Sequence, residues 1–185
     1  AYLQDDSQEF WRAKKRPAVV IFPGGAYAYC SDREADPVAQ EYLRAGYHAF
    51  VLRYSVGWEN AVWPNPLEDY DQAMELIAAH AKEWHLIPEK IAVIGFSAGG
   101  HLAACAATMA KHRPAAAILA YPVILEGLAA ICAKGAPGAD KAVDSQTCPC
   151  FIAATGTDTT VSAMNSLRFV EALYENGISA ELHLY

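Results

Sequence analysis

Short apolar runs that alternate with helical patterns constrain the fold of this chain more than any other feature. The runs are rich in Val, Ile and Ala and end at glycine, proline or polar residues, which is typical of strands buried on both faces of a sheet. Strands that alternate with helices predict an α/β fold with a mainly parallel central sheet and helices on both faces. The expected strands are 18–22, 48–54, 91–95, 115–120, 150–155 and 179–185.

Helical spacing of apolar residues separates these runs. Asp36 is the expected N-cap of the first helix, with Pro37 as its first helical residue and Gly46 just beyond its end. The segment 126–147 shows no clear pattern. We expect a single domain over residues 1–185, incomplete at both ends and with a shortened cap segment around 126–147. The expected helices are 37–45, 67–83, 99–111 and 163–175.

The sequence Gly95-Phe96-Ser97-Ala98-Gly99 follows an apolar strand and precedes an Ala-rich helix. A strained strand-to-helix turn of this kind exposes a serine hydroxyl at the edge of the sheet. A nucleotide-binding turn is the alternative, but Ser97 replaces the second glycine of that motif, and no lysine follows for a P-loop. Ser97 is therefore the predicted nucleophile.

A second glycine turn, Pro23-Gly24-Gly25-Ala26-Tyr27, follows the first expected strand. Backbone amides that stabilise an oxyanion must be free of side-chain crowding. An ordinary turn would have the same composition, but a nucleophile on the same sheet favours a functional role. The expected oxyanion donors are the amides of Gly25, Ala26 and Ala98.

An acid must orient the base histidine of a serine hydrolase, and in this fold it follows the serine in chain order. Asp158 lies after a late strand, in Thr155-Gly156-Thr157-Asp158, and is the predicted acid. Asp144 is the main competitor, although it precedes that strand.

No histidine occupies the loop where the base is expected. His101 lies in the helix after Ser97, in a register that points it away from the hydroxyl, so we expect it to be a packed helix residue. His183 lies inside the last strand. The remaining histidines lie in or beside other helices and strands: His48, His80, His85 and His112.

These motifs resemble the esterase/lipase branch of the α/β-hydrolase superfamily, which includes acetyl-xylan-esterase-like and feruloyl-esterase-like carbohydrate esterases. The resemblance covers nearly the whole chain. It implies a Ser-Asp-His triad with Ser97 and Asp158, an acyl-enzyme intermediate, and neither metal nor organic cofactor. The family's Gly-x-His-Gly loop would follow Tyr185, so the general-base histidine is expected after that residue. The resembling stretches are 16–27, Ser31-Asp32-Arg33-Glu34, 46–55, 95–104, and Asp158 with Asn165-Ser166-Leu167.

Composition limits the partners and the compartment. The formal net charge of −7 disfavours nucleic acid, and no apolar run is long enough to span a membrane. The five cysteines are irregularly spaced and form no zinc motif. We expect them to be reduced and mainly buried, which favours a cytoplasmic protein, or a secreted one if a signal peptide was removed. They are Cys30, Cys105, Cys132, Cys148 and Cys150.

The expected activity is hydrolysis of short-chain carboxylic esters, including acetyl esters on small-molecule or oligosaccharide substrates such as xylan sugars. A peptidase or thioesterase of the same fold is the alternative within the class, because the triad does not specify the leaving group. A catalytically inactive binding module is the alternative outside it. Trp58 and Trp63 are candidates for a sugar or aromatic subsite, although buried packing is the favoured interpretation. The sequence does not specify an oligomeric state.

Overall fold

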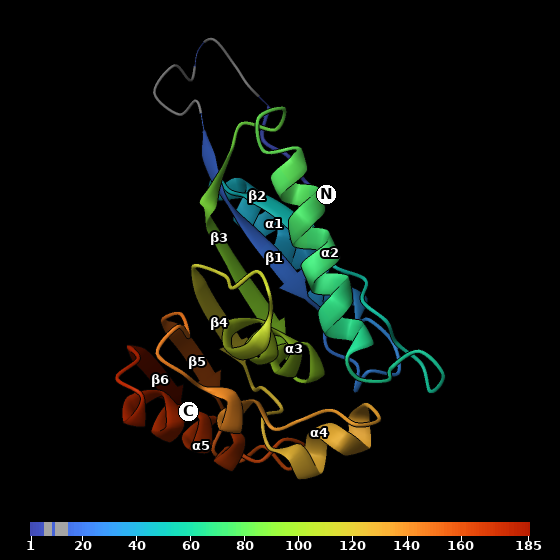
Figure 1. Ribbon diagram of the computed structural model, residues 1–185, viewed down its shortest axis with the longest axis vertical. Coiled ribbons are helices and arrows are strands. Elements are labelled where there is room, and N and C mark those ends of the chain that lie inside the picture. The colour runs from blue at the N-terminus through green and yellow to red at the C-terminus, as the bar shows by residue number, and fades with distance from the viewer. Residues whose placement is uncertain (6–8, 10–14) are drawn as a thin grey trace.

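The computed structural model describes residues 1–5, 9 and 15–185, and it contains the predicted parallel sheet. Six strands pair in the order β2-β1-β3-β4-β5-β6, and every pair of neighbours is parallel. Figure 1 shows the sheet running from β2 to β6. The strands are β1 (Arg16–Phe22), β2 (His48–Val51), β3 (Leu86–Phe96), β4 (Ala116–Ala120), β5 (Cys150–Ala154) and β6 (Ala180–Leu184).

Five α-helices and two short 3₁₀ helices connect these strands in the described part of the chain. The α-helices are α1 (Asp36–Arg44), α2 (Asn65–Ala79), α3 (Ala98–Met109), α4 (Glu126–Cys132) and α5 (Met164–Glu175), and the 3₁₀ helices are η2 (Asp32–Glu34) and η3 (Ala139–Ala142).

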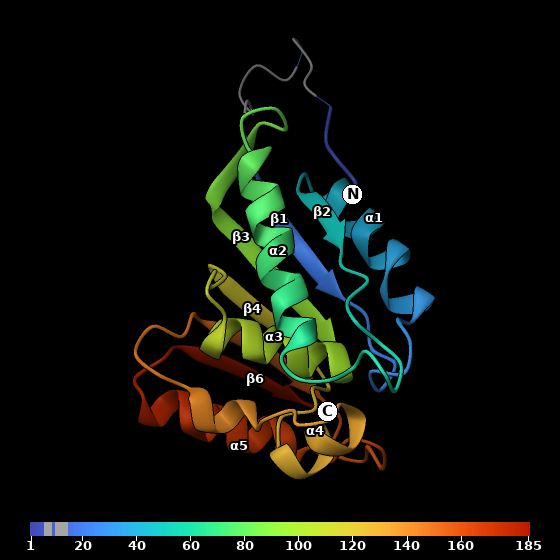
Figure 2. The ribbon, with the colours of Figure 1, turned by 45° about the vertical axis from the view of Figure 1, so that its right-hand side comes forward.

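The helices cover the two faces of the sheet unequally. Alternate residues of β1 divide between two apolar clusters: Val20 belongs to the larger one and Val19 to the smaller one. The larger cluster includes residues of α2, α3 and α5, and Figure 2 shows α2 and α3 lying along one side of the sheet. The smaller cluster lies under α1, around Ala39. Helices on both faces are thus confirmed.

Helix α3 is buried on nearly all sides, since only Met109 among its residues is not fully buried. A helix that is apolar all round belongs in a core, and its alanines and glycines allow a close approach to the sheet. A Cβ added to Gly99 would lie 2.1 Å from the carbonyl oxygen of Phe22, and one added to Gly95 would lie 2.1 Å from that of Gly99. Close packing therefore requires glycine at positions 95 and 99, in addition to any requirement of the turn.

Several predicted boundaries were wrong. Asp36 is the first residue of α1 rather than its N-cap, which is Ala35. Helix α2 begins at Asn65, with a proline in its first turn, and ends at Ala79, because the chain must turn back before β3 starts at Leu86. The segment 126–147, for which no pattern was seen, contains α4 and η3, which are too short to show periodicity.

None of the helices in the described ranges 1–5, 9 and 15–185 is both long enough and apolar enough to span a bilayer.

Candidate active site

Ser97 lies on a strained turn between β3 and α3. Its φ of 54° and ψ of −116° fall where residues other than glycine are rare. The turn is held by neighbouring backbone: the Ser97 amide donates to the carbonyl of Ala120 at 3.0 Å, and the Val123 amide donates to the carbonyl of Ser97 at 3.0 Å. Strain that is maintained by its surroundings is characteristic of functional positions. The predicted elbow is therefore present in the backbone.

The glycine turn after β1 forms a second strained loop beside Ser97. Gly25, Ala26 and Tyr27 have φ values of 126°, 52° and 57°. Among the described residues, no backbone or side-chain acceptor takes a hydrogen bond from the amide of Gly25 or Ala26. Ala98 is the first residue of α3, and the first amides of a helix have no partner within it. The amides of Gly25 and Ala26 thus lack a protein acceptor at the Ser97 cavity, whereas Ala98 is fully buried and does not line that cavity.

A buried hydrogen bond between Tyr27 and His101 ties this loop to α3. The Tyr27 hydroxyl donates to Nδ1 of His101 at 2.8 Å, and Nε2 of His101 donates to the carbonyl of Pro137 at 2.8 Å. Both partners fit the neutral tautomer protonated at Nε2. Complete burial lowers the pKa of His101 to about 4. His101 is therefore neutral, and it is a packed helix residue as predicted.

One cavity, with a volume of about 430 Å³, brings together most of the predicted site residues. Ser97, Asp158, Gly25 and Ala26 line it, whereas the third predicted oxyanion donor, Ala98, does not. Other lining residues come from η2, from the residue after β4 and from the loop that carries Asp158. The full lining is Gly25, Ala26, Ala28, Tyr29, Ser31, Arg33, Glu34, Ser97, Tyr121, Asp158, Thr160 and Val161.

Asp158 is fixed by its own loop. Its Oδ1 accepts hydrogen bonds from the amides of Thr160 at 2.8 Å and Val161 at 2.9 Å. Farther along, Asn165 ties α5 to the segment after β4, because its buried side-chain oxygen accepts from the amides of Ile124 and Leu125. The Asp158 carboxylate is thus oriented by backbone amides, and its Oδ2 has no hydrogen-bond partner among the described residues.

Comparison with known proteins identifies the family and the fold of this chain. The family profile of BD-FAE matches residues 9–125. The chain belongs to the BD-FAE family. Among solved structures, the α/β hydrolase MGS-M1 from a Medee basin deep-sea metagenome library is 47% identical with a TM-score of 0.90, over 99% of this chain and 73% of its own. The acetyl ester-xyloside bifunctional hydrolase of Caldicellulosiruptor lactoaceticus is 32% identical with a TM-score of 0.88, over 100% and 75%. The fold is therefore that of an α/β hydrolase.

Curated relatives agree in sequence over shorter fractions of their length. Endo-1,4-beta-xylanase B of Butyrivibrio fibrisolvens is 31% identical over 96% of this chain and 32% of its own length. The acetylxylan esterase of Xylanibacter ruminicola is 34% identical over 58% of this chain and 22% of its own length. The BD-FAE chain described here thus spans about a fifth to a third of the curated relatives it matches.

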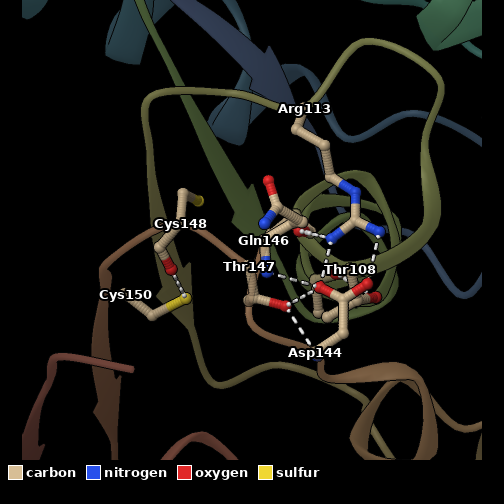
Figure 3. A network of polar contacts seen from close by, with 9 residues as sticks. Thr108, Arg113, Asp144, Gln146, Thr147, Cys148 and Cys150 are labelled. Atoms are coloured by element: carbon tan, nitrogen blue, oxygen red, sulfur yellow. Dashed lines mark hydrogen bonds and ion pairs between the residues drawn. The ribbon is translucent and has the colours of Figure 1, made fainter. Parts of the chain in front are cut away.

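Asp144, the competing acid, lies in a different environment from Asp158. Arg113 donates to both of its carboxylate oxygens, at 2.9 and 3.0 Å, as Figure 3 shows. The Thr147 hydroxyl and the Gln146 amide also donate to Oδ1. The hydrogen bonds from Arg113 hold the pKa of Asp144 at about 2. Asp144 does not line the Ser97 cavity, and its acceptor oxygens are already occupied by structural partners.

None of the six histidines, all of which lie in described parts of the chain, lines the Ser97 cavity. His183 is in β6, where its ring lies 5.1 Å from that of Phe151 and its Nε2 contacts Glu181. His112 pairs with Glu75, and His80 stacks on Trp84. The expectation that the described chain brings no histidine to Ser97 is consistent with this geometry.

Sequence reasoning assigned no role to Glu34 and Tyr121, which both line the cavity. The Tyr121 hydroxyl donates to Oε1 of Glu34 at 2.9 Å, and the Gly24 amide donates to Oε2 at 2.6 Å. The available signal was the stretch Ser31-Asp32-Arg33-Glu34, which was part of the family resemblance. Spacing alone does not show that Glu34 reaches the end of β4.

A second cavity, of about 580 Å³, lies next to the first and shares Ala26 and Ala28 with it. Trp58 is 90% exposed at this cavity, so the expectation that it packs in the core was wrong. Trp63 is half-buried against the main core, as expected. The lining is mostly apolar: Ala26, Tyr27, Ala28, Gly57, Trp58, Ala61, Ala130, Ile131, Cys132, Lys134 and Gly135.

The cysteines are unpaired, as predicted: three are buried and two, Cys30 and Cys132, are half-buried. The described residues contain no cluster of three or more His, Cys, Asp or Glu side chains suited to a metal ion.

Proposed function

We propose that this chain is the nucleophile-bearing part of a serine ester hydrolase that cleaves short-chain carboxylic esters, with acetyl esters of plant-type sugars as the substrate class. One observation carries the proposal: a strained serine, free oxyanion amides and an oriented aspartate surround a single cavity. The names of the relatives support the chemistry, because they include acetylxylan and carboxylic esterases.

In the proposed reaction, the Ser97 oxygen attacks the ester carbonyl while a histidine accepts the hydroxyl proton. The amides of Gly25, Ala26 and Ala98 stabilise the negative charge that develops on the carbonyl oxygen. The histidine then returns the proton to the departing alcohol, leaving an acyl group on Ser97. Water, activated by the same base, hydrolyses this acyl-enzyme. Asp158 holds the histidine in the required tautomer and stabilises its charged form.

The proposed general base is a histidine that follows Tyr185 in the native sequence. The amide of Gly156 donates to the carbonyl of Tyr185 at 2.7 Å, so the chain at Tyr185 lies beside the loop that carries Asp158. A segment leaving this point is close to the acid that would orient it. None of the six histidines, all in described parts of the chain, lines the Ser97 cavity.

The second cavity is the proposed site for the alcohol part of the ester. It adjoins the Ser97 cavity at the oxyanion loop, and the exposed indole of Trp58 offers a surface on which a sugar or aryl ring can stack. Trp58→Ala should raise KM for an aryl or sugar acetate by about fivefold, the equivalent of ~1 kcal/mol of stacking. Turnover of vinyl acetate, whose alcohol part has no ring, should be unchanged.

The decisive test of the function uses Ser97→Ala in the complete native protein. Ser97→Ala should fold normally but lose activity on p-nitrophenyl acetate by a factor on the order of 10⁶, the cost of removing a triad nucleophile. It should also fail to react with a fluorophosphonate probe. Ser145→Ala, which removes an exposed serine at the opposite edge of the sheet, is the matched control. A Ser97→Ala protein that kept a tenth of its activity would exclude this nucleophile.

Comparing the 185-residue chain with a chain that carries the proposed histidine after Tyr185 tests the base. The shorter chain should retain only the roughly 10³–10⁴-fold residual acceleration over water that binding and the oxyanion amides provide. Equal and high activity in both proteins would assign the base to a histidine already present. Thioester and peptide substrates, assayed in parallel, distinguish the esterase from the alternative hydrolases, and a native protein unreactive to the probe would indicate a binding module.

A further inference from the structure

We propose that Glu34 is a positioning residue that clamps the oxyanion loop against the nucleophile turn through two hydrogen bonds from its carboxylate. The inference rests on the proposed function, since it assigns a residue to the same site. Glu34 touches neither the serine oxygen nor a substrate in this role. It acts through Gly24 and Tyr121.

The two carboxylate oxygens bind groups from different strands. Oε2 accepts from the Gly24 amide at 2.6 Å, one residue before the predicted oxyanion donor Gly25. Oε1 accepts from the Tyr121 hydroxyl at 2.9 Å, directly after β4. Burial and the bond to Glu34 raise the pKa of Tyr121, so the hydroxyl stays protonated and continues to donate. One side chain thus joins the ends of two strands.

Sheet order places Ser97 between these two points. Gly24 follows β1, Ser97 follows β3 and Tyr121 follows β4, and the three strands are neighbours in the order β1-β3-β4. The ring of Tyr121 also packs at 6.1 Å from that of Phe96, the residue before the nucleophile. The Glu34 carboxylate therefore bridges the flanks of the nucleophile turn.

Close packing at Gly24 shows how tightly the clamp fits. A Cβ added to Gly24 would lie 2.7 Å from Glu34 Oε2, 2.8 Å from the Phe96 carbonyl and 3.2 Å from the Ser97 Cβ. Gly24 is thus confined between the carboxylate and the nucleophile turn. Any shift of the carboxylate would allow the Gly24–Gly25 peptide, and with it the oxyanion amides, to move.

Charge pairing does not account for the position of Glu34. The ion pairs among the described residues do not include it, although its neighbour Asp32 pairs with Arg53 at 2.8 Å. A half-buried carboxylate close to a predicted oxyanion site is electrostatically unfavourable for catalysis, because it repels the developing negative charge. The role of Glu34 is therefore to accept two hydrogen bonds, from Gly24 and Tyr121, and not to supply charge.

The test compares Glu34→Ala and Glu34→Gln in the complete native protein, with Glu89→Ala, an exposed residue at the start of β3, as the matched control. Glu34→Ala should lower kcat by about 10- to 100-fold, less than the 10²–10³ caused by removing an oxyanion donor outright, with KM for p-nitrophenyl acetate unchanged. Glu34→Gln should restore most of kcat, because its amide oxygen can accept from Gly24 and its amide nitrogen can donate to Tyr121.

Affinity for a phenylboronic acid separates positioning from general stability. The boronate forms a tetrahedral adduct on serine with one oxygen at the oxyanion position, so its Ki should rise in Glu34→Ala by the same factor as kcat falls. Tyr121→Phe should lose about three- to tenfold in kcat, less than Glu34→Ala, because the hydrogen bond from the Gly24 amide remains. This variant and Glu34→Gln carry the test if Glu34→Ala does not fold.

Three results would overturn the inference while Ser97→Ala remains inactive: unchanged kcat and boronate Ki in Glu34→Ala, a Glu34→Gln protein as impaired as Glu34→Ala, or a rise in KM with unchanged kcat. An active Ser97→Ala protein would instead refute the proposed function itself.

Discussion

Asp158 and Asp144 lie at opposite ends of β5, and their surroundings differ in what they leave free. Asp144, before the strand, has a bidentate arginine, a threonine hydroxyl and a backbone amide on its carboxylate. Asp158, after the strand, uses only Oδ1, for two amides of its own loop, and faces the Ser97 cavity. One acid is fully occupied by structure, and the other keeps an oxygen for a partner.

The contrast extends to the two edges of the sheet. At the carboxyl edge, Ser97 and the predicted oxyanion loop have strained backbones, and the amides of Gly25 and Ala26 have no acceptor among the described residues. At the amino edge, Arg113 and Asp144 satisfy each other. In a parallel sheet, the carboxyl edge carries the loops where ligands bind, while the amino edge can be optimised for stability. Four measurements test this distinction, beginning with the largest expected effect.

Asp158→Asn should lower kcat by roughly 10⁴, because an amide leaves the histidine in the wrong tautomer. The amides of Thr160 and Val161 donate to Oδ1, which asparagine retains, so the thermal midpoint should change little. Steady-state turnover of p-nitrophenyl acetate and a melting curve on the same sample measure both. Asp144→Asn should keep nearly full turnover, and the reverse ranking would move the acid to Asp144.

The fold should lose stability in mild acid through the buried imidazole of His101, on the helix that follows Ser97. Its folded pKa is lowered to about 4 from 6.5, so the unfolded state takes up the extra proton between these values. Stability should fall by about 3 kcal/mol as the pH drops from 6.5 to 4, and then no further from this group. Urea unfolding across that range measures it. His101→Gln should flatten the slope, and a slope equal to that of the native protein would exclude His101 as its source.

Asp144→Asn should cost about 1 kcal/mol of unfolding free energy at pH 7, a value near the upper end for partly exposed ion pairs because the arginine contact is bidentate. The expected pattern is a stability loss with retained activity, the opposite of Asp158→Asn. The Gln146 amide and the Thr147 hydroxyl can still donate to the side-chain oxygen of asparagine in the variant. A variant with native stability would show that the network in Figure 3 contributes nothing measurable.

The smallest effect concerns acid below pH 4. The pKa of Asp144 is held at about 2, below its ordinary 3.8, so its contribution is complete above pH 3.8 and is lost as the pH falls towards 2. The native protein and Asp144→Asn should therefore differ in stability near pH 5 and converge near pH 2. Curves that remain parallel down to pH 2 would contradict the assigned ionisation.

Much of this arrangement was predictable because local patterns encode it. The six strands, the elbow around Ser97, the glycine turn after β1 and the packing of His101 inside its helix all followed from residue type and spacing. Boundaries were less accurate: α2 starts two residues earlier than expected, and α4 was missed because seven residues show too little periodicity. Trp58 was misplaced because an indole in a loop packs or projects according to its neighbours.

Local sequence was enough to predict the α/β order and the residues of the proposed nucleophile turn, because apolar runs and turn glycines act over a few residues. Tertiary structure decided which of these residues meet. Glu34 reaches Tyr121 across 87 positions of sequence, and Asp144 meets Arg113 across 31. Such contacts depend on strand order and helix packing, which arise from burial of the whole sheet. Burial of the sheet brings Glu34 against Gly24 and Tyr121, beside Ser97. It also pairs Asp144, the alternative acid, with Arg113.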